Sequence, residues 1–63
     1  MGSNHQDEGF IIEYQQVGGS VKVTAFDPVT LKEAVIIGPT TAKSKHLADI
    51  AVKKLLYILG RDA

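Results

Sequence analysis

His46 and Asp49 are the two side chains whose types and spacing come closest to acid–base chemistry. An aspartate three residues after a histidine lies on the same side of a helix, where its carboxylate can orient the imidazole as a general base. Neither Ser20 nor Ser44 has a base beside it in the fold expected below, and His5 lies in the polar N-terminal segment. An exposed helix position accounts for His46 without any chemistry, so we predict that the protein is not an enzyme.

Metal and cofactor sites have no support in the sequence. The chain contains no cysteine, which excludes a disulfide and a thiolate metal site. His46 has no second histidine to join it, and the carboxylates show no ligand spacing. We therefore expect no metal ion and no cofactor, and the lack of cysteine fits a reducing compartment.

The segment from Gly38 to Lys45 has some features of an anion site. It reads G-P-T-T-A-K-S-K and opens a predicted helix, whose free N–H groups favour a negative charge. Its glycine and lysine spacing is not that of a P-loop, and ordinary capping beside solvated lysines gives the same pattern. Residues 34–63 hold five basic and two acidic side chains, whereas residues 1–33 hold two basic and five acidic ones. The candidate side chains for an anion or a nucleic acid are Lys43, Lys45, His46 and Lys53.

Strands must position any such site, and apolar and polar residues alternate over residues 10–37. The pair Gly18-Gly19 predicts a two-residue type I′ turn, closed by the residues on either side. A slip of one residue would mix the two faces, so the register is well specified. The facing pairs that follow are Tyr14 with Val23, and Ile12 with Ala25.

Residues 27–30, which read D-P-V-T, predict the second turn, because proline suits its second position and aspartate accepts local backbone hydrogen bonds. If Asp27 pairs with Lys32, Leu31 takes the last loop position, where a left-handed backbone is common and unfavourable for leucine. The facing pairs are then Ala25 with Ala34, and Val23 with Ile36. The expected strands are 10–17, 20–27 and 32–37, with the second in the middle.

Apolar residues at helical spacing near the C-terminus predict one amphipathic helix that covers one face of the sheet. Thr40 or Thr41 would cap its N-terminus, Gly60 would end it, and Asp49 would pair with Lys53 one turn later. The helix residues expected to face the sheet are Leu47, Ala48, Ala51, Val52, Leu55, Ile58 and Leu59. The sheet residues expected beneath them are Phe10, Ile12, Tyr14, Val21, Val23, Ala25, Ala34 and Ile36. The predicted fold is α+β, a three-stranded antiparallel meander packed on one C-terminal helix (β-β-β-α).

Apolar side chains remain on the uncovered sheet face and on the flank of the helix. They are Ile11, Phe26, Val35, Ile37, Leu56 and Tyr57. A contiguous apolar patch marks a protein interface, whereas scattered surface hydrophobes are normal. Because so small a core gains from burying more surface, we expect a homodimer or another protein partner. Nucleic-acid binding through the basic helix N-terminus is the alternative.

The length of 63 residues allows a single domain. We expect a disordered tail over residues 1–9, a domain over 10–60 and a frayed C-terminus over 61–63. No apolar run is long enough to span a membrane, and residues 1–9 lack the apolar region of a secretory signal. The expected location is the cytoplasm, with no membrane partner.

Two resemblances support this interpretation. The strings V-G-G-S-V-K-V-T-A-F-D-P-V-T, E-A-V-I-I-G-P and A-V-K-K-L-L-Y-I-L resemble a family of short uncharacterised alphaproteobacterial proteins, with Leu31 in place of the usual glycine. That resemblance implies a bacterial cytoplasmic protein and brings no activity, cofactor or site. Residues 43–51 are similar to the start of the last helix of double-stranded-RNA-binding domains, where a basic cluster grips phosphates. Asp49 stands where the third basic residue of that cluster belongs, and the first RNA-reading helix of those domains is absent.

Overall fold

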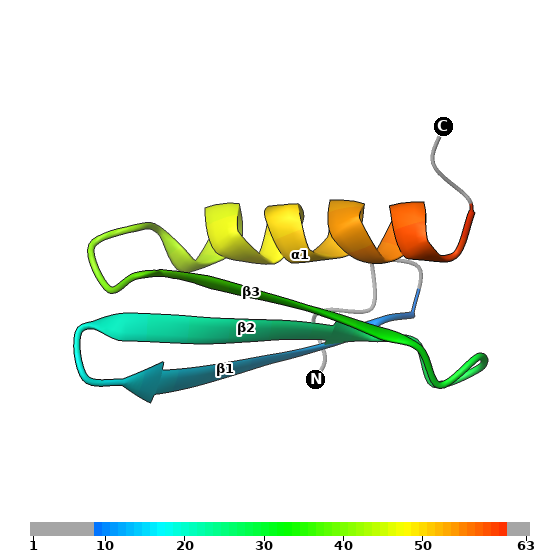
Figure 1. The fold of residues 1–63 in the computed structure, drawn as a ribbon, viewed down its shortest axis with the longest axis horizontal. Helices are drawn as coiled ribbons and strands as arrows, with labels where there is room; N and C mark the ends of the chain where they lie inside the picture. The colour runs from blue at the N-terminus through cyan, green and yellow to red at the C-terminus, as the bar shows by residue number, and fades with distance from the viewer. Residues whose placement is uncertain (1–8, 61–63) are drawn as a thin grey trace.

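Three strands and one helix make up the computed structural model, which describes residues 9–60. They are β1 (Ile11–Val17), β2 (Ser20–Phe26), β3 (Glu33–Pro39) and α1 (Ser44–Ile58). The strands form one antiparallel sheet in the order β1-β2-β3, and α1 lies across one face of it (Figure 1). The predicted α+β meander is confirmed. Of the disordered tail predicted over residues 1–9, only Gly9 is described, and it lies in a turn. The rest of that tail and the fraying predicted for 61–63 lie outside the described residues.

The predicted strand register is also confirmed. Tyr14 faces Val23 and Ile12 faces Ala25 across β1 and β2, and the pairs predicted between β2 and β3 form as well. The first turn differs in type, because only Gly18 has a positive φ, at 61°. A type II′ turn needs a positive φ at its first central residue alone, whereas type I′ needs it at both. Both types close the same pair of strand residues, so the register is unaffected.

The second turn confirms the loop predicted around Asp27. Its backbone N–H donates to the Lys32 carbonyl at 2.9 Å, and Leu31 adopts the predicted left-handed backbone with φ at 68°. The Asp27 carboxylate accepts hydrogen bonds from the Val29 N–H at 3.0 Å and from Thr30 Oγ1 at 2.9 Å. Since Asp27 is only 5% exposed, this network fixes the loop and offsets the strain at Leu31.

The helix begins later than predicted, and the expected threonine cap is wrong. Lys43 precedes the first turn of α1 in an extended conformation, and no side chain caps it. The Thr40 N–H instead donates to the Gly19 carbonyl at 3.2 Å, which prolongs the β2–β3 ladder by one bond. The predicted stop at Gly60 is confirmed, because its φ is 75° and its N–H donates to the Tyr57 carbonyl at 3.0 Å.

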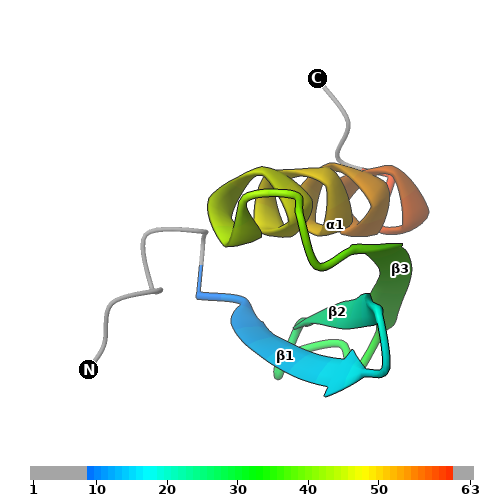
Figure 2. The same cartoon turned by 90° about the vertical axis from the view of Figure 1, so that its left-hand side faces the viewer.

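The core lies between α1 and two of the strands. Helix α1 contacts mainly β2 and β3, and β1 lies farthest from it (Figure 2). Tyr14 was predicted to be buried and is 50% exposed, because α1 packs on β2 and β3 and does not cover β1. The apolar residues that are buried are Phe10, Val23, Ala25, Ala34, Leu47, Ala48, Ala51 and Leu55.

Candidate interaction surface

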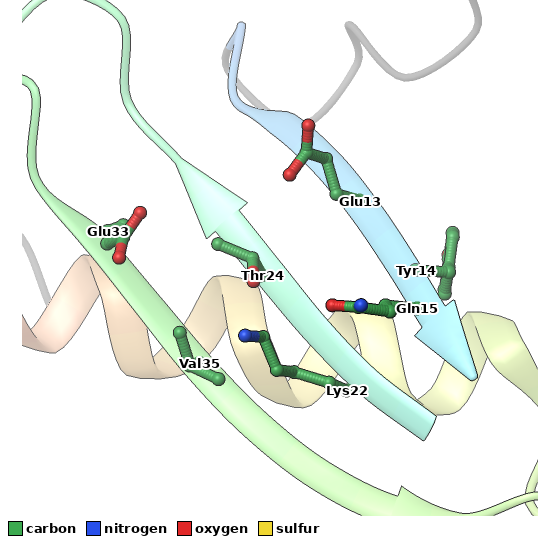
Figure 3. A pocket seen from close by; sticks show the side chains of 7 residues that line it. All are labelled: Glu13, Tyr14, Gln15, Lys22, Thr24, Glu33 and Val35. Carbon is green, nitrogen blue, oxygen red and sulfur yellow. The ribbon is translucent and has the colours of Figure 1, made fainter. Parts of the chain in front are cut away.

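The sheet face opposite α1 has a polar centre. A shallow depression of about 570 Å³ lies there, between side chains of all three strands (Figure 3). Lys22 on β2 faces Gln15 on β1, and the carboxylates of Glu13 and Glu33 lie on the strands to either side. Mixed charges at the centre of a face favour solvent over a dry interface.

The six predicted interface residues do not form one patch. Ile11, Phe26, Val35 and Ile37 lie on the open sheet face, whereas Leu56 and Tyr57 belong to α1 on the other side. Ile37 and Tyr57 are 64% and 74% exposed, but Phe26 and Val35 are half-buried. Leu56 is half-buried and packs against the core, so the expectation that it remains on an uncovered flank of the helix is wrong.

Strand β1 is an edge strand with an open outer edge. Its last residue, Val17, pairs with Ser20 across a two-residue loop, and such a closing pair is hydrogen-bonded. Bonding then alternates along the strand, so Ile12, Tyr14 and Gln16 direct their backbone N–H and C=O groups away from β2. Within residues 9–60, no hydrogen bond reaches these outward groups.

Apolar side chains also flank this edge. Tyr14 is 50% exposed on the helix side of the sheet, and Val17 is 60% exposed on the open side, as is Ile11 at 45%. Neither Tyr14 nor Val17 was among the predicted interface residues. For Tyr14 a signal was present, because a helix about 10 Å wide covers only about two strands spaced at 4.8 Å, so one of three strands must stay uncovered.

Strand β3, the other edge, is protected. Its outward groups include the Val35 carbonyl, and the Lys54 Nζ from α1 donates to it at 3.0 Å. The strand ends at Pro39, which has no N–H to offer a further strand. A lysine and a proline on an edge are two devices by which proteins prevent unwanted strand addition. Within residues 9–60 the two edges therefore differ, because a side chain from α1 occupies an outward carbonyl of β3 and none occupies an outward group of β1.

The basic residues predicted for anion binding are all exposed on or beside α1. Lys45 Nζ lies 3.5 Å from the Asp49 carboxylate, so Asp49 pairs with this lysine rather than with the predicted Lys53. Among the described residues, no hydrogen bond joins His46 to Asp49, and no group of His, Cys, Asp or Glu side chains is arranged to hold a metal ion. Lys43, His46 and Lys53 are thus solvated side chains, and the Asp49 carboxylate lies on the same helix between His46 and Lys53 in sequence.

No helix within residues 9–60 is long and apolar enough to cross a membrane. The chain matches the family model of a domain of unknown function (DUF6898) over residues 7–62. No curated protein and no solved structure matches the chain.

Proposed function

The chain belongs to the DUF6898 family, a domain of unknown function, and we propose that it is a non-enzymatic module that associates with a second copy of itself. The observation that carries this proposal is the placement of α1 over β2 and β3. It leaves Tyr14 of β1 exposed on the helix side of the sheet, and Ile11 and Val17 are exposed on the open side of the same strand, although all three are apolar or aromatic. A chain of 63 residues buries a small core, and self-association is a common way to bury more.

The non-enzymatic part of the proposal rests on the one acid–base pair considered from the sequence. Catalysis would need the Asp49 carboxylate to orient the His46 ring. Asp49 instead pairs with Lys45, and His46 is solvated. The sequence resemblance described above supports a bacterial, cytoplasmic setting, which belongs to the same proposal.

Nucleic-acid binding is the second candidate. It is favoured by the solvent exposure of Lys43, Lys45, His46 and Lys53. Asp49 counts against it, because a carboxylate paired with Lys45 repels phosphates. Fluorescence anisotropy with labelled duplex RNA and duplex DNA tests it. Binding that weakens steeply with salt would support this candidate, and no binding at low salt would eliminate it.

Sedimentation equilibrium of the full chain across the micromolar range tests the proposed function. We expect a reversible dimer whose fraction rises with protein concentration. A matched pair of variants then locates the contact: Val17→Glu on β1 should shift the protein towards monomer, whereas Tyr57→Glu on α1 should not. A wild-type protein that sediments as a monomer at every concentration would overturn the proposal.

A further inference from the structure

We propose that the second copy adds to the outer edge of β1 as an antiparallel strand centred on Tyr14, so that two three-stranded sheets become one continuous sheet. This inference rests on the self-association proposed above and adds its geometry. It contrasts with stacking of the two open sheet faces, whose polar centre around Lys22 would have to be desolvated.

The backbone of β1 has the symmetry that such pairing requires. A two-fold axis pairs a strand with itself in antiparallel fashion, so the outward groups must be distributed evenly about its centre. The outward groups belong to Ile12, Tyr14 and Gln16, and Tyr14 is the middle residue of the seven in β1. Tyr14 then exchanges both of its backbone hydrogen bonds with the partner's Tyr14. Ile12 does the same with the partner's Gln16.

The side chains agree with this register on both faces. On the open face, Ile11 comes opposite the partner's Val17, and both are apolar and exposed. Glu13 comes opposite the partner's Gln15, whose amide can donate to the carboxylate. On the helix face the two Tyr14 rings meet at the axis, where aromatic pairs stabilise antiparallel strands. Glu13 is the only charged residue in β1, so no like charges face each other directly.

Other antiparallel registers are less favourable. Moving the centre by one residue to Glu13 places this carboxylate directly opposite its own copy, and like charges in that position destabilise a sheet. Moving it to Gln15 leaves Ile11 and Ile12 without partners within β1. Only the register centred on Tyr14 pairs all seven residues of the strand.

The asymmetry between the two edges explains why assembly would stop at two copies. When β1 pairs with β1, the outer edges of both β1 strands are hydrogen-bonded to each other and are no longer available. The edges that remain are the two β3 strands, where Lys54 occupies the Val35 carbonyl and Pro39 ends the strand. Such edges resist further strand addition, so a closed dimer results rather than a fibre.

A matched pair of proline variants tests whether the edge of β1 is the interface. Gln16→Pro removes an N–H that points away from β2, and Ile37→Pro removes an N–H that points away from β2 on the edge of β3. Both leave the internal ladder intact, as proline on an edge strand can do. In sedimentation experiments we expect Gln16→Pro to be monomeric and Ile37→Pro to remain dimeric. Circular dichroism checks that both are folded.

Single-cysteine variants test the register and do not depend on proline, since the chain has no cysteine of its own. Oxidised Tyr14→Cys should give a covalent dimer, because residues opposite each other in a hydrogen-bonded pair have Cα atoms about 5.5 Å apart, within disulfide range. Gln16→Cys should not, because its two copies lie four residues apart along the strands, about 13 Å.

The outcomes separate the inference from the proposed function. A monomeric wild type overturns both. A dimer that survives Gln16→Pro, together with equal cross-linking of the two cysteine variants, overturns the edge pairing and leaves self-association standing. A dimer lost in Gln16→Pro, and cross-linked through Tyr14→Cys alone, supports both.

Discussion

The Cδ2 methyl group of Leu47 lies 2.6 Å from the point where a Cβ on Gly38 would stand. Leu47 is the first buried residue of α1, and Gly38 is a buried residue of β3 with no positive φ. The glycine is therefore needed for space rather than for backbone freedom. Because Gly38 has no side chain, the first turn of α1 can pack closely against the backbone of β3. This close contact helps to determine the position of α1 over β2 and β3.

Replacing Gly38 by alanine should destabilise the fold. The new methyl group would displace the buried Leu47 side chain, and overpacking of this kind costs about 1–3 kcal/mol. Chemical denaturation measures the change in the free energy of unfolding. Gly19→Ala is the matched control, because nothing lies within 4 Å of its Cβ position and its φ is not positive. Equal losses in the two variants would contradict the close-contact argument.

A double variant gives a second test of the same contact. Leu47→Ala alone should cost about 2–5 kcal/mol, as for other buried leucines. In the Gly38→Ala background, the truncated side chain leaves room for the new methyl group. The double variant should therefore lose clearly less stability than the two single variants added together. Strict additivity would show that Gly38 and Leu47 do not compete for the same space.

Replacing Leu31 by glycine should stabilise the protein. Leu31 has a φ of 68° and is 70% exposed, so the substitution relieves a left-handed backbone and removes little packing. A left-handed backbone costs a non-glycine residue about 1–2 kcal/mol. Glycine has a greater conformational entropy in the unfolded chain, which reduces this gain, so we expect a net increase of about 0.5–1 kcal/mol in the free energy of unfolding. Val29→Gly, in the same loop without a positive φ, should instead lower the melting temperature.

Replacing Asp27 by alanine should unfold the second turn more easily. It removes the acceptor for the Val29 N–H and for the Thr30 hydroxyl, and the loss of such partly buried bonds costs about 1–3 kcal/mol. Asp27→Asn keeps one oxygen to accept from the Val29 N–H, and its amide NH₂ can donate to Thr30 Oγ1 in place of the second acceptor, so it should retain most of the stability. Thermal unfolding followed by circular dichroism compares the two. A loss as large in the asparagine variant would assign the effect to charge rather than to these hydrogen bonds.

The strand register was predictable from the sequence because it depends on local chemistry. Gly18-Gly19 and Asp27 fix two short turns, and a turn of known length determines every pair that follows it. Even the unfavourable backbone of Leu31 follows from that counting. The helix end at Gly60 is equally local, since a glycine there supplies the left-handed residue that closes the last turn.

What the sequence did not reveal depends on contacts between distant segments. Thr40 does not cap the helix because its backbone N–H donates to the carbonyl of Gly19, in the first turn, which keeps Thr40 in the strand ladder, and the helix begins only at Ser44. Tyr14 has the periodicity of a core residue, but periodicity indicates a face and not whether a helix reaches that strand. The contact of Lys54 with the β3 edge could not be predicted from the hydrophobic pattern of the sequence either. In that pattern Lys54 is an ordinary exposed helix residue, and only the packing of α1 on β3 places it beside Val35.

Lys54→Met should open the β3 edge to further strand addition. It removes the hydrogen bond to the Val35 carbonyl, which costs about 0.5 kcal/mol of stability at an exposed site. It also removes the positive charge that disfavours strand addition at this edge. If wild-type dimers form through β1, a second open edge lets them join through β3, so species larger than dimers should appear in sedimentation velocity. Lys53→Met is the matched control, because it makes the same chemical change one residue away, at a side chain that no described hydrogen bond ties to the sheet. Larger species in both variants would indicate non-specific association through the added methionine. If Lys54→Met forms no species larger than a dimer, Pro39 and the geometry of β3 are sufficient to prevent strand addition without Lys54.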